Sequence, residues 1–414
     1  MKKVNRNRKS RIKIAVVTLI VVVLAALGGL GGYYYFRTRG TGAADSAEQS
    51  GQEQQPAEQK TASFHFTGVG DNLLHDPIYY YFEQDYGNRN YLPIYEETLK
   101  YTNGADLSYI NFETLCAGDA FGLSGYPNFN GPTEMMDTLR QAGFNWFSTS
   151  SNHSYDRQTE GLMAEMNYIN ENLPGIAYTG TSLTEEASNT PKVVDINGIK
   201  VGLESFTYGL NGYTLPEGEE WLVNQFLTPD GQINYDLMKK KLDALKAVSD
   251  VQIVTMHWGD EYQTVPSELQ KEAARFLNEQ GVEVVIGTHP HVIQPAELLS
   301  TPEQETLIYY SLGNFVSAQD AFERMIGGMA DFDLNYDFTT GKTTFSNVKF
   351  IPTITYITPD LRTYRTTTIH EYNNELAANH YIQTVEGQDM SREAVQAFVR
   401  QVMGEPQGIE VVYE

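Results

Sequence analysis

Two neighbouring stretches of the chain decide its fold class. Residues 251–259 read VQIVTMHWG, and residues 282–291 read VEVVIGTHPH. Each is an apolar run of strand length that ends in histidine. Residues 266–281 between them, PSELQKEAARFLNEQG, start with Pro266, end with Gly281 and repeat apolar residues at helical spacing. A strand–helix–strand unit of this kind indicates an α/β fold.

Three earlier apolar runs follow the same pattern. They are SFHFTGVG (63–70), DLSYINFE (106–113) and FNWFSTSSNH (144–153). Asp71 follows the first run, Glu113 ends the second, and Asn152 and His153 end the third. A helical segment, PTEMMDTLRQAG (132–143), separates the second run from the third. Because ligands in open α/β sheets gather beyond the carboxyl ends of the strands, we expect these side chains to share one site.

The pattern of apolar residues changes after Asp331. Residues 331–357 alternate apolar and polar side chains around the turn signal Thr340-Gly341-Lys342, which predicts an antiparallel hairpin. RTYRTTTIH (362–370) suggests a further strand, and SREAVQAFVRQVMG (391–404) predicts a helix capped by Ser391. We therefore assign residues 61–330 to an α/β domain and residues 331–414 to a β-hairpin and helix that complete it.

Composition and charge exclude several classes of protein. The 414 residues include one cysteine, Cys116, so an intramolecular disulfide is impossible, and we expect Cys116 to be a small buried hydrophobe. The formal net charge is −24. Residues 1–13 hold seven basic and no acidic residues, and subtracting these seven positive charges leaves −31 for the rest. Such an acidic surface repels phosphate backbones, which argues against nucleic acid as a partner.

The N-terminal region predicts a membrane anchor. Residues 14–36, IAVVTLIVVVLAALGGLGGYYYF, carry no charge, and their 23 residues exceed the roughly 20 that span a bilayer. The basic residues 1–13 precede this span, so the positive-inside rule predicts a cytoplasmic N-terminus and an extracellular C-terminal domain. A cleaved signal peptide is the alternative, although its apolar region is usually shorter. Residues 37–60 are rich in Ala, Gly, Ser, Gln and Glu, which predicts a flexible linker.

The histidines carry the strongest chemical signal. His289 and His291 flank Pro290, and in an extended segment both imidazoles would project to the same side. His257 ends the preceding strand of the same unit, and Asp260 and Glu261 either orient it or are solvated loop acids. Imidazole is the commonest metal ligand in proteins, so this pattern predicts a metal site at the strand ends.

Oxygen donors at the other strand ends complete the predicted site. Asp71 and Glu113 supply carboxylates that can neutralise a divalent metal or a bridged pair. Asn152 offers an amide oxygen, and His153 beside it is a candidate general acid, with Asp156 nearby in SNHSYD. His75 and Asp76 are close to Asp71 in sequence, and the sequence leaves open whether they belong to the site. Nitrogen and oxygen donors without thiolate suit Mn²⁺, Fe or Zn²⁺.

Six ordered motifs give these residues a family context. The chain resembles the bacterial capsule-synthesis CapA family, also called PgsA-like after poly-γ-glutamate synthesis, over residues 64–317. That family is similar to the calcineurin-like metallophosphoesterases. The motifs are GDNLLHD, ADLSYINFE, SNHSYDRQTEGL, HWGDEY, GTHPHVIQP and YYSLGNFVS.

The resemblance implies a fold and a set of roles. The fold would be an αββα sandwich of two mixed β-sheets flanked by helices. His153 would assist the leaving group. The residues that would hold a divalent metal are Asp71, Glu113, Asn152, His257, His289 and His291.

The chain departs from the metallophosphoesterase pattern in two places. Asn72 and Leu73 follow Asp71 where those enzymes have Asp-x-His, and Phe112-Glu113 replaces Gly-Asp. Both departures fall in the motifs that would build a bridged pair of metals.

Three functions fit the sequence. The first is a membrane-anchored, extracytoplasmic component of capsule or poly-γ-glutamate biosynthesis or export. Its expected partners are the membrane, other synthesis subunits and an anionic polymer. The second is a surface metallohydrolase that acts on phosphate esters or cell-wall amide bonds, and the third is a non-catalytic scaffold of a cell-envelope assembly.

Overall fold

The computed structural model describes residues 60–302 and 304–414. The basic N-terminus, the expected membrane span and nearly all of the expected linker therefore lie outside the described residues. Among the helices that the structure describes, none combines the length and the apolar character needed to cross a membrane.

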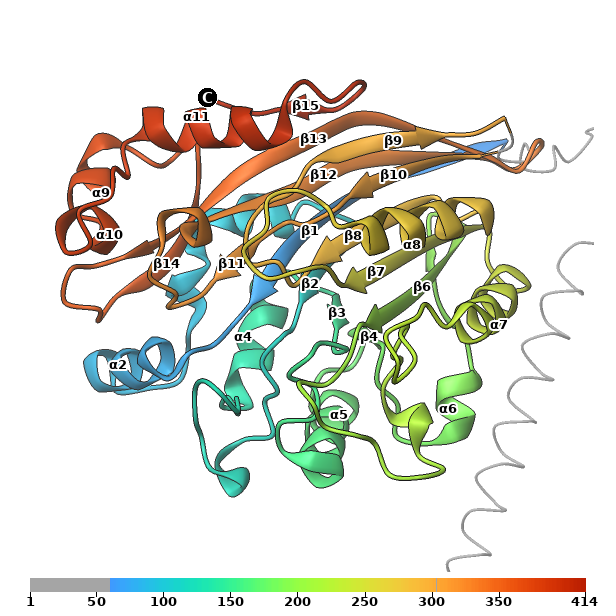
Figure 1. Cartoon of the computed structure of the whole chain (residues 1–414), viewed down its shortest axis with the longest axis horizontal. Coiled ribbons are helices and arrows are strands. Elements are labelled where there is room, and N and C mark those ends of the chain that lie inside the picture. Colours follow the sequence, from blue (N-terminus) through green and yellow to red (C-terminus); the bar gives the residue numbers. More distant parts are fainter. Residues whose placement is uncertain (1–59, 303) are drawn as a thin grey trace, which may run out of the picture. The chain divides into compact units, whose positions relative to one another are not determined.

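The first of two mixed sheets is built around the long strand β1, which pairs in parallel with β2 and antiparallel with β12. Within the described residues it has nine strands, and Figure 1 shows β12 and β13 extending it as one long hairpin. Its main order is β14 (Tyr364–Thr368), β13 (Lys342–Ile357), β12 (Ile326–Asp337), β1 (Thr61–Asn72), β2 (Leu107–Asn111), β3 (Trp146–Ser148) and β4 (Ala177–Thr179), while β11 (Asn314–Val316) pairs with β1 and β15 (Glu410–Val411) with β13.

The second sheet has six strands in the described part of the chain. Its centre is parallel and both of its edge strands are antiparallel to their neighbours. Its order is β5 (Lys192–Ile196), β6 (Ile199–Thr207), β7 (Val251–His257), β8 (Val284–Thr288), β10 (Glu305–Tyr309) and β9 (Ala296–Ser300).

Helix α8 shows how local sequence sets the two ends of a helix. Helix α8 starts after Ser267, whose side chain forms a reciprocal capping box with Gln270, and the chain leaves it through Gly281 at φ 80°. The helices are α2 (Asp76–Tyr86), α3 (Leu99–Thr102), α4 (Glu134–Gln141), α5 (Gln158–Asn172), α6 (Glu185–Asn189), α7 (Tyr235–Lys246), α8 (Glu268–Glu279), α9 (Asn374–Ala378), α10 (Tyr381–Thr384) and α11 (Arg392–Met403). Short 3₁₀ turns cover Leu92–Ile94, Glu96–Thr98, Asp119–Phe121, Glu220–Leu222 and Phe322–Met325.

Successive residues of the second sheet pack into two different cores. Ile253 of β7 belongs to the large core that the first sheet also fills, whereas Val254 packs with Met238 of α7 and Leu277 of α8. Adjacent side chains of a strand point to opposite faces, so both faces of this sheet are buried. This burial explains why its strands read as continuous apolar runs.

The predicted α/β class with two mixed sheets flanked by helices is confirmed. The hairpin predicted after Asp331 is β12 and β13, the strand near residues 362–370 is β14, and the helix capped by Ser391 is α11. Figure 1 shows α11 lying along β13.

A close backbone approach brings the ends of β1 and β11 together. Asp71 N donates to Gly313 O at 2.9 Å. A Cβ atom at Gly70 would lie 1.9 Å from Gly313 O, so only glycine allows this contact. The contact places Asp71 beside the segment that carries Asn314.

Candidate metal centre

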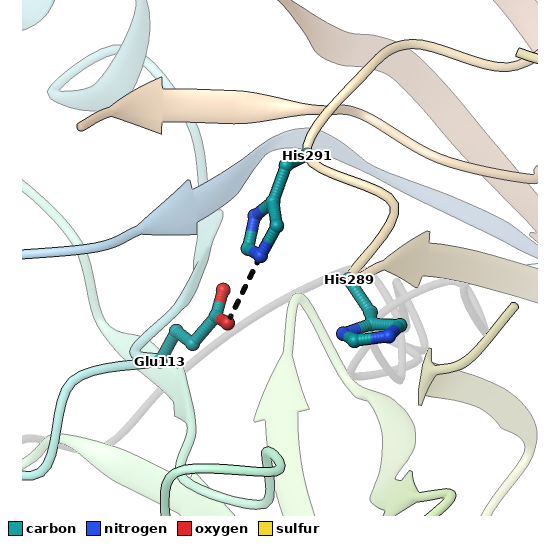
Figure 2. Close-up of side chains that lie close together, drawn as sticks. All are labelled: Glu113, His289 and His291. Atoms are coloured by element: carbon teal, nitrogen blue, oxygen red, sulfur yellow. Dashed lines mark ion pairs between the residues drawn. The ribbon is translucent and has the colours of Figure 1, made fainter. Parts of the chain in front are cut away.

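Four strand ends from both sheets bring His and carboxylate side chains into one buried cluster. Two groups of three have ligand-capable atoms that all lie within 4.8 Å of one another, and both include Glu113. One group is Glu113, His289 and His291, drawn in Figure 2, and the other is Asp71, Glu113 and His257. The predicted convergence of these side chains is therefore present in the structure.

Glu113 lies between the histidines. Figure 2 shows its carboxylate directed at the His291 ring, with Oε1 of Glu113 3.6 Å from Nε2 of His291. The same oxygen lies 3.8 Å from Nε2 of His257. Neither carboxylate oxygen has a hydrogen-bond partner among the described residues, although both are buried. Burial, with Asp71 adding repulsion, raises the pKa of Glu113 well above its usual range.

The segment that carries His289 and His291 is not extended, contrary to our expectation. Both residues have left-handed backbone angles, φ 93° for His289 and φ 57° for His291. Such angles are uncommon outside glycine and mark a strained segment. The two rings still lie side by side, with centroids 5.8 Å apart, because the bend after β8 turns both toward Glu113.

His257 is held from both ring nitrogens. Its Nε2 lies 3.0 Å from Oδ1 of Asn152, and its Nδ1 lies 3.1 Å from Oγ1 of Thr288 and 3.3 Å from Nδ2 of Asn111. Burial, reinforced by neighbouring histidines, lowers the pKa of His257 and of His289 well below the usual value. Both imidazoles are therefore neutral near pH 7, which is the form that binds metals.

Asp71 is anchored through both carboxylate oxygens. Oδ1 accepts from Nδ2 of Asn111 at 2.7 Å and from the backbone N–H of His289 at 3.3 Å. Oδ2 lies 3.1 Å from Nδ1 of His291. Asp71 thus ties the first sheet to the His289–His291 bend of the second.

Two asparagines that the sequence analysis did not single out support the cluster. Asn111 contacts both Asp71 and His257. Asn314 places Oδ1 3.1 Å from Nδ1 of His291, and its Nδ2 donates to the backbone oxygen of Arg324 at 3.0 Å. Both asparagines lie at strand ends inside the quoted motifs ADLSYINFE and YYSLGNFVS, which is the signal that could have found them.

His153 stands beside the cluster with a carboxylate partner. Its Nδ1 lies 2.7 Å from Oδ2 of Asp156, which also accepts from the backbone N–H of Phe129 at 2.6 Å. Nδ2 of Asn211 lies 3.4 Å from Nε2 of His153. A carboxylate next to Nδ1 favours the tautomer that carries its proton on that nitrogen.

Several nearby candidates do not join the cluster. His75 contacts Leu73 O at 3.3 Å and Ala318 N at 3.2 Å through Nδ1, and burial lowers its pKa to about 4. Asp260 and Glu261 are exposed, and in the described part of the chain neither hydrogen-bonds to His257. The orienting role considered for them belongs to Asn111 and Thr288. Cys116 is buried, as expected.

The donor set fits a divalent metal. Among the described residues, neither oxygen of Glu113 has a hydrogen-bond partner, nor does Nδ1 of His289, although all three atoms are buried. Unpaired buried polar atoms are costly, and a cation would satisfy all three. Leu73 is a buried apolar residue, and Oδ1 of Asn72 accepts from the Tyr95 hydroxyl at 2.6 Å. The two residues that follow Asp71 therefore add no imidazole to the cluster.

The two mixed sheets and this buried cluster define an α/β protein with a candidate divalent-metal centre. The model of the family described as bacterial capsule synthesis protein PGA_cap matches residues 65–319, and the chain belongs to that family. This match confirms the family identified from the six motifs.

Two curated relatives carry related names. The chain is 27% identical over 186 residues to the PGA biosynthesis protein CapA of Bacillus subtilis strain 168, a match that covers 45% of this chain and 46% of that protein. It is 27% identical over 188 residues to the capsule biosynthesis protein CapA of Bacillus anthracis, covering 45% and 43%. The matched region thus spans about half the length of each relative.

Similar solved structures include two proteins named as enzymes. A novel phosphatase of Mycoplasma pneumoniae aligns with a TM-score of 0.42 and 17% identity, covering 70% of this chain and 94% of that one. The 5′-nucleotidase of Candida albicans aligns with a TM-score of 0.38 and 12% identity, covering 82% and 57%.

Proposed function

We propose that this chain is a component of capsule or poly-γ-glutamate assembly that binds a divalent metal and uses it for hydrolysis. The observation that carries the proposal is the buried carboxylate of Glu113, which lies between His257 and His291 and has no hydrogen-bond partner in the described part of the chain. A folded protein keeps such a group at a cost in stability, which is typical of a functional site.

Each predicted ligand has a place in this proposal. Glu113 would be the central ligand, because it belongs to both groups of converging side chains. A divalent metal held there would supply Lewis-acid chemistry, polarising the substrate and lowering the pKa of a water molecule. The residues that would hold it are Asp71, Glu113, Asn152, His257, His289 and His291.

His153 supplies the proton in this proposal. Asp156 holds Nδ1 of His153, which leaves Nε2 as the atom that delivers a proton to the leaving group. Phe129 packs edge-on against the His153 ring with centroids 4.6 Å apart, which fixes the ring plane.

The biological setting is proposed from the family and the names of the relatives. Those names point to biosynthesis of capsule and of the polymer abbreviated PGA. We propose that residues 14–36 anchor the chain in the cell membrane, with the described domain outside. Contact between this acidic chain and an anionic polymer would require bridging cations.

Metal analysis and turnover test the proposal on the same samples. We expect the purified full chain to retain Mn²⁺, Fe or Zn²⁺ and to hydrolyse a phosphodiester such as bis(p-nitrophenyl) phosphate. His289→Ala should lose both properties. A wild-type chain that binds none of these metals would overturn the proposal.

A scaffold without turnover is the second candidate. It is favoured by Leu73, which leaves one metal position with fewer donors than the metallophosphoesterase pattern provides. This alternative predicts metal binding without hydrolysis of phosphate esters or cell-wall amides, and polymer export that His153→Ala leaves intact.

A further inference from the structure

Arg324 and Tyr262 form a stacked pair at the edge of the candidate metal centre. The guanidinium carbon of Arg324 lies 3.8 Å from the centroid of the Tyr262 ring. The Tyr262 ring in turn lies 6.1 Å from the His291 ring, measured between centroids. Stacking on an aromatic face fixes the plane of a guanidinium and leaves its N–H groups free at the edges.

Both partners are tied to the metal-centre segments by backbone hydrogen bonds. Tyr262 N donates to the carbonyl of Pro290, between the two histidines, at 2.7 Å. Tyr262 also has a left-handed backbone angle, φ 64°, which is strained for an aromatic residue. On the other side, the backbone oxygen of Arg324 accepts from Asn314, which contacts His291. The pair is therefore positioned by the same residues that position His291.

The Arg324 guanidinium keeps unused hydrogen-bonding capacity. Within residues 60–302 and 304–414 it donates no hydrogen bond, and its ion-pair partner Asp320 lies 3.5 Å away with a side chain that is 71% exposed. Arg157, an arginine next to the His153 loop, differs because its guanidinium binds the carbonyls of Phe121 and Asp156. Arg324 can thus offer a pair of N–H donors to a ligand, whereas the guanidinium of Arg157 is already engaged by backbone carbonyls.

We infer that Arg324, held on Tyr262, recognises an anionic group that the substrate carries beside the bond processed at the centre. The group would be a carboxylate or a phosphate, since both present two oxygens to the guanidinium fork. Arg324 packs on Tyr262 and belongs to neither group of converging metal-ligand candidates, so the recognised anion is a neighbouring group rather than the reacting one. The inference rests on the proposed function, because it assumes that a substrate binds at the metal centre.

The site also explains how an acidic chain can bind an anion. The acids of the cluster, Asp71 and Glu113, are buried, whereas the acids beside the stacked pair, Glu261 and Asp320, are exposed to solvent. The Arg324 side chain is 28% exposed and Tyr262 is 39% exposed, so solvent reaches this pair. A ligand can therefore reach a positive group at the rim without approaching the buried carboxylates.

Equilibrium binding of three matched esters to the metal-loaded full chain tests the inference. The probes are p-nitrophenyl propyl phosphate, its 2-carboxyethyl analogue and its 2-phosphoethyl analogue, measured by calorimetry. We expect the wild type to bind at least one of the two anionic analogues about 10- to 100-fold more tightly than the propyl ester. The preferred analogue identifies whether the recognised group is a carboxylate or a phosphate.

Variants separate recognition by Arg324 from a structural role. The preference is the affinity for the anionic analogue divided by the affinity for the propyl ester. Arg324→Ala should reduce this ratio to about one. Arg324→Lys should keep part of it, because the charge remains without the planar fork. Tyr262→Leu should weaken it by releasing the guanidinium. Arg400→Ala is the matched control, because Arg400 stacks on Tyr413 at 4.3 Å on helix α11 and should leave the preference unchanged. Metal content and thermal unfolding are measured for each variant.

The outcomes distinguish the two proposals. Equal binding of all three esters by the wild type, or an undiminished preference in a folded, metal-loaded Arg324→Ala, overturns the inference. A preference that depends on Arg324 without turnover of any ester supports the inference and counts against hydrolysis alone.

Discussion

Oε1 of Glu113 and Nε2 of His291 lie 3.6 Å apart in the core of the protein, although they come from different sheets. The distance permits an ion pair, yet the carboxylate receives no hydrogen bond from the described residues. The pKa of Glu113 is raised well above its usual range because burial disfavours its charge. A negative charge on Glu113 is therefore costly in the protein alone, and a bound cation would offset that cost.

Replacement of Glu113 by Gln should separate stability from metal binding. The neutral amide removes a buried charge, so the metal-free variant should unfold at the same or a higher denaturant concentration than wild type. Metal affinity should fall at least about 100-fold, since a shared ligand is lost. Chelator competition and urea unfolding measure the two effects. A destabilised metal-free variant with normal metal affinity would contradict this account.

Loss of Asn111 or Asn314 should weaken metal binding without removing a ligand. Asn111→Ala frees Asp71 and His257, and Asn314→Ala frees His291, so affinity should fall about 10- to 100-fold in each case. Asn278→Ala is the control, because buried Asn278 donates to Leu299 O and Thr306 away from the centre. It should lower stability and leave metal affinity unchanged. Equal affinity losses in all three variants would indicate a general folding effect.

Replacement of Asp156 by Asn should slow turnover and leave metal content intact. The amide cannot hold the His153 ring through Nδ1 as the carboxylate does, so kcat should fall by about 10²- to 10⁴-fold. KM should change little, because Asp156 does not reach the cluster of metal-ligand candidates. Steady-state kinetics with a phosphodiester measure the effect. An unchanged kcat would exclude His153 as the proton donor.

His65 should make stability depend on pH above neutrality. Its hydrogen bond with Asp331, opposed by burial and supported by Asp333, raises its pKa from 6.5 to about 9. The folded state then holds a proton that the unfolded state has lost, so this stabilisation is full below pH 6.5 and disappears as pH rises through 9. Urea unfolding of wild type and His65→Gln from pH 6 to 10 should show curves that converge at high pH. A constant difference would contradict the assignment.

Removal of Leu277 should test the packing of α8 on the second sheet. The side chain is fully buried with Val254 and Met256, and Leu277→Ala should reduce the free energy of unfolding by about 2–5 kcal/mol. Ser267→Ala, which removes the capping box, should cost about 1 kcal/mol. A larger effect at Ser267 than at Leu277 would show that α8 depends on its cap more than on its packing.

The local patterns predicted the elements well because their causes are local. Apolar runs marked β7 and β8, Ser391 marked the start of α11, and Thr340-Gly341-Lys342 marked the hairpin turn. The conformation of the THPH segment was predicted incorrectly as extended. Its left-handed angles depend on Asp71, which accepts from the His289 backbone and contacts the His291 ring.

The sequence by itself determined the α/β class, the polar strand ends and the residue types able to bind a metal. Only the tertiary structure decided which of them meet. Glu113 joins both groups, Asn111 and Asn314 hold the ligands, and His75 and Glu261 remain outside the cluster. The physical reason is that periodicity and capping act over a few residues. Distances between side chains on different sheets depend on strand register, on the Gly70–Gly313 contact and on the packing of the shared core.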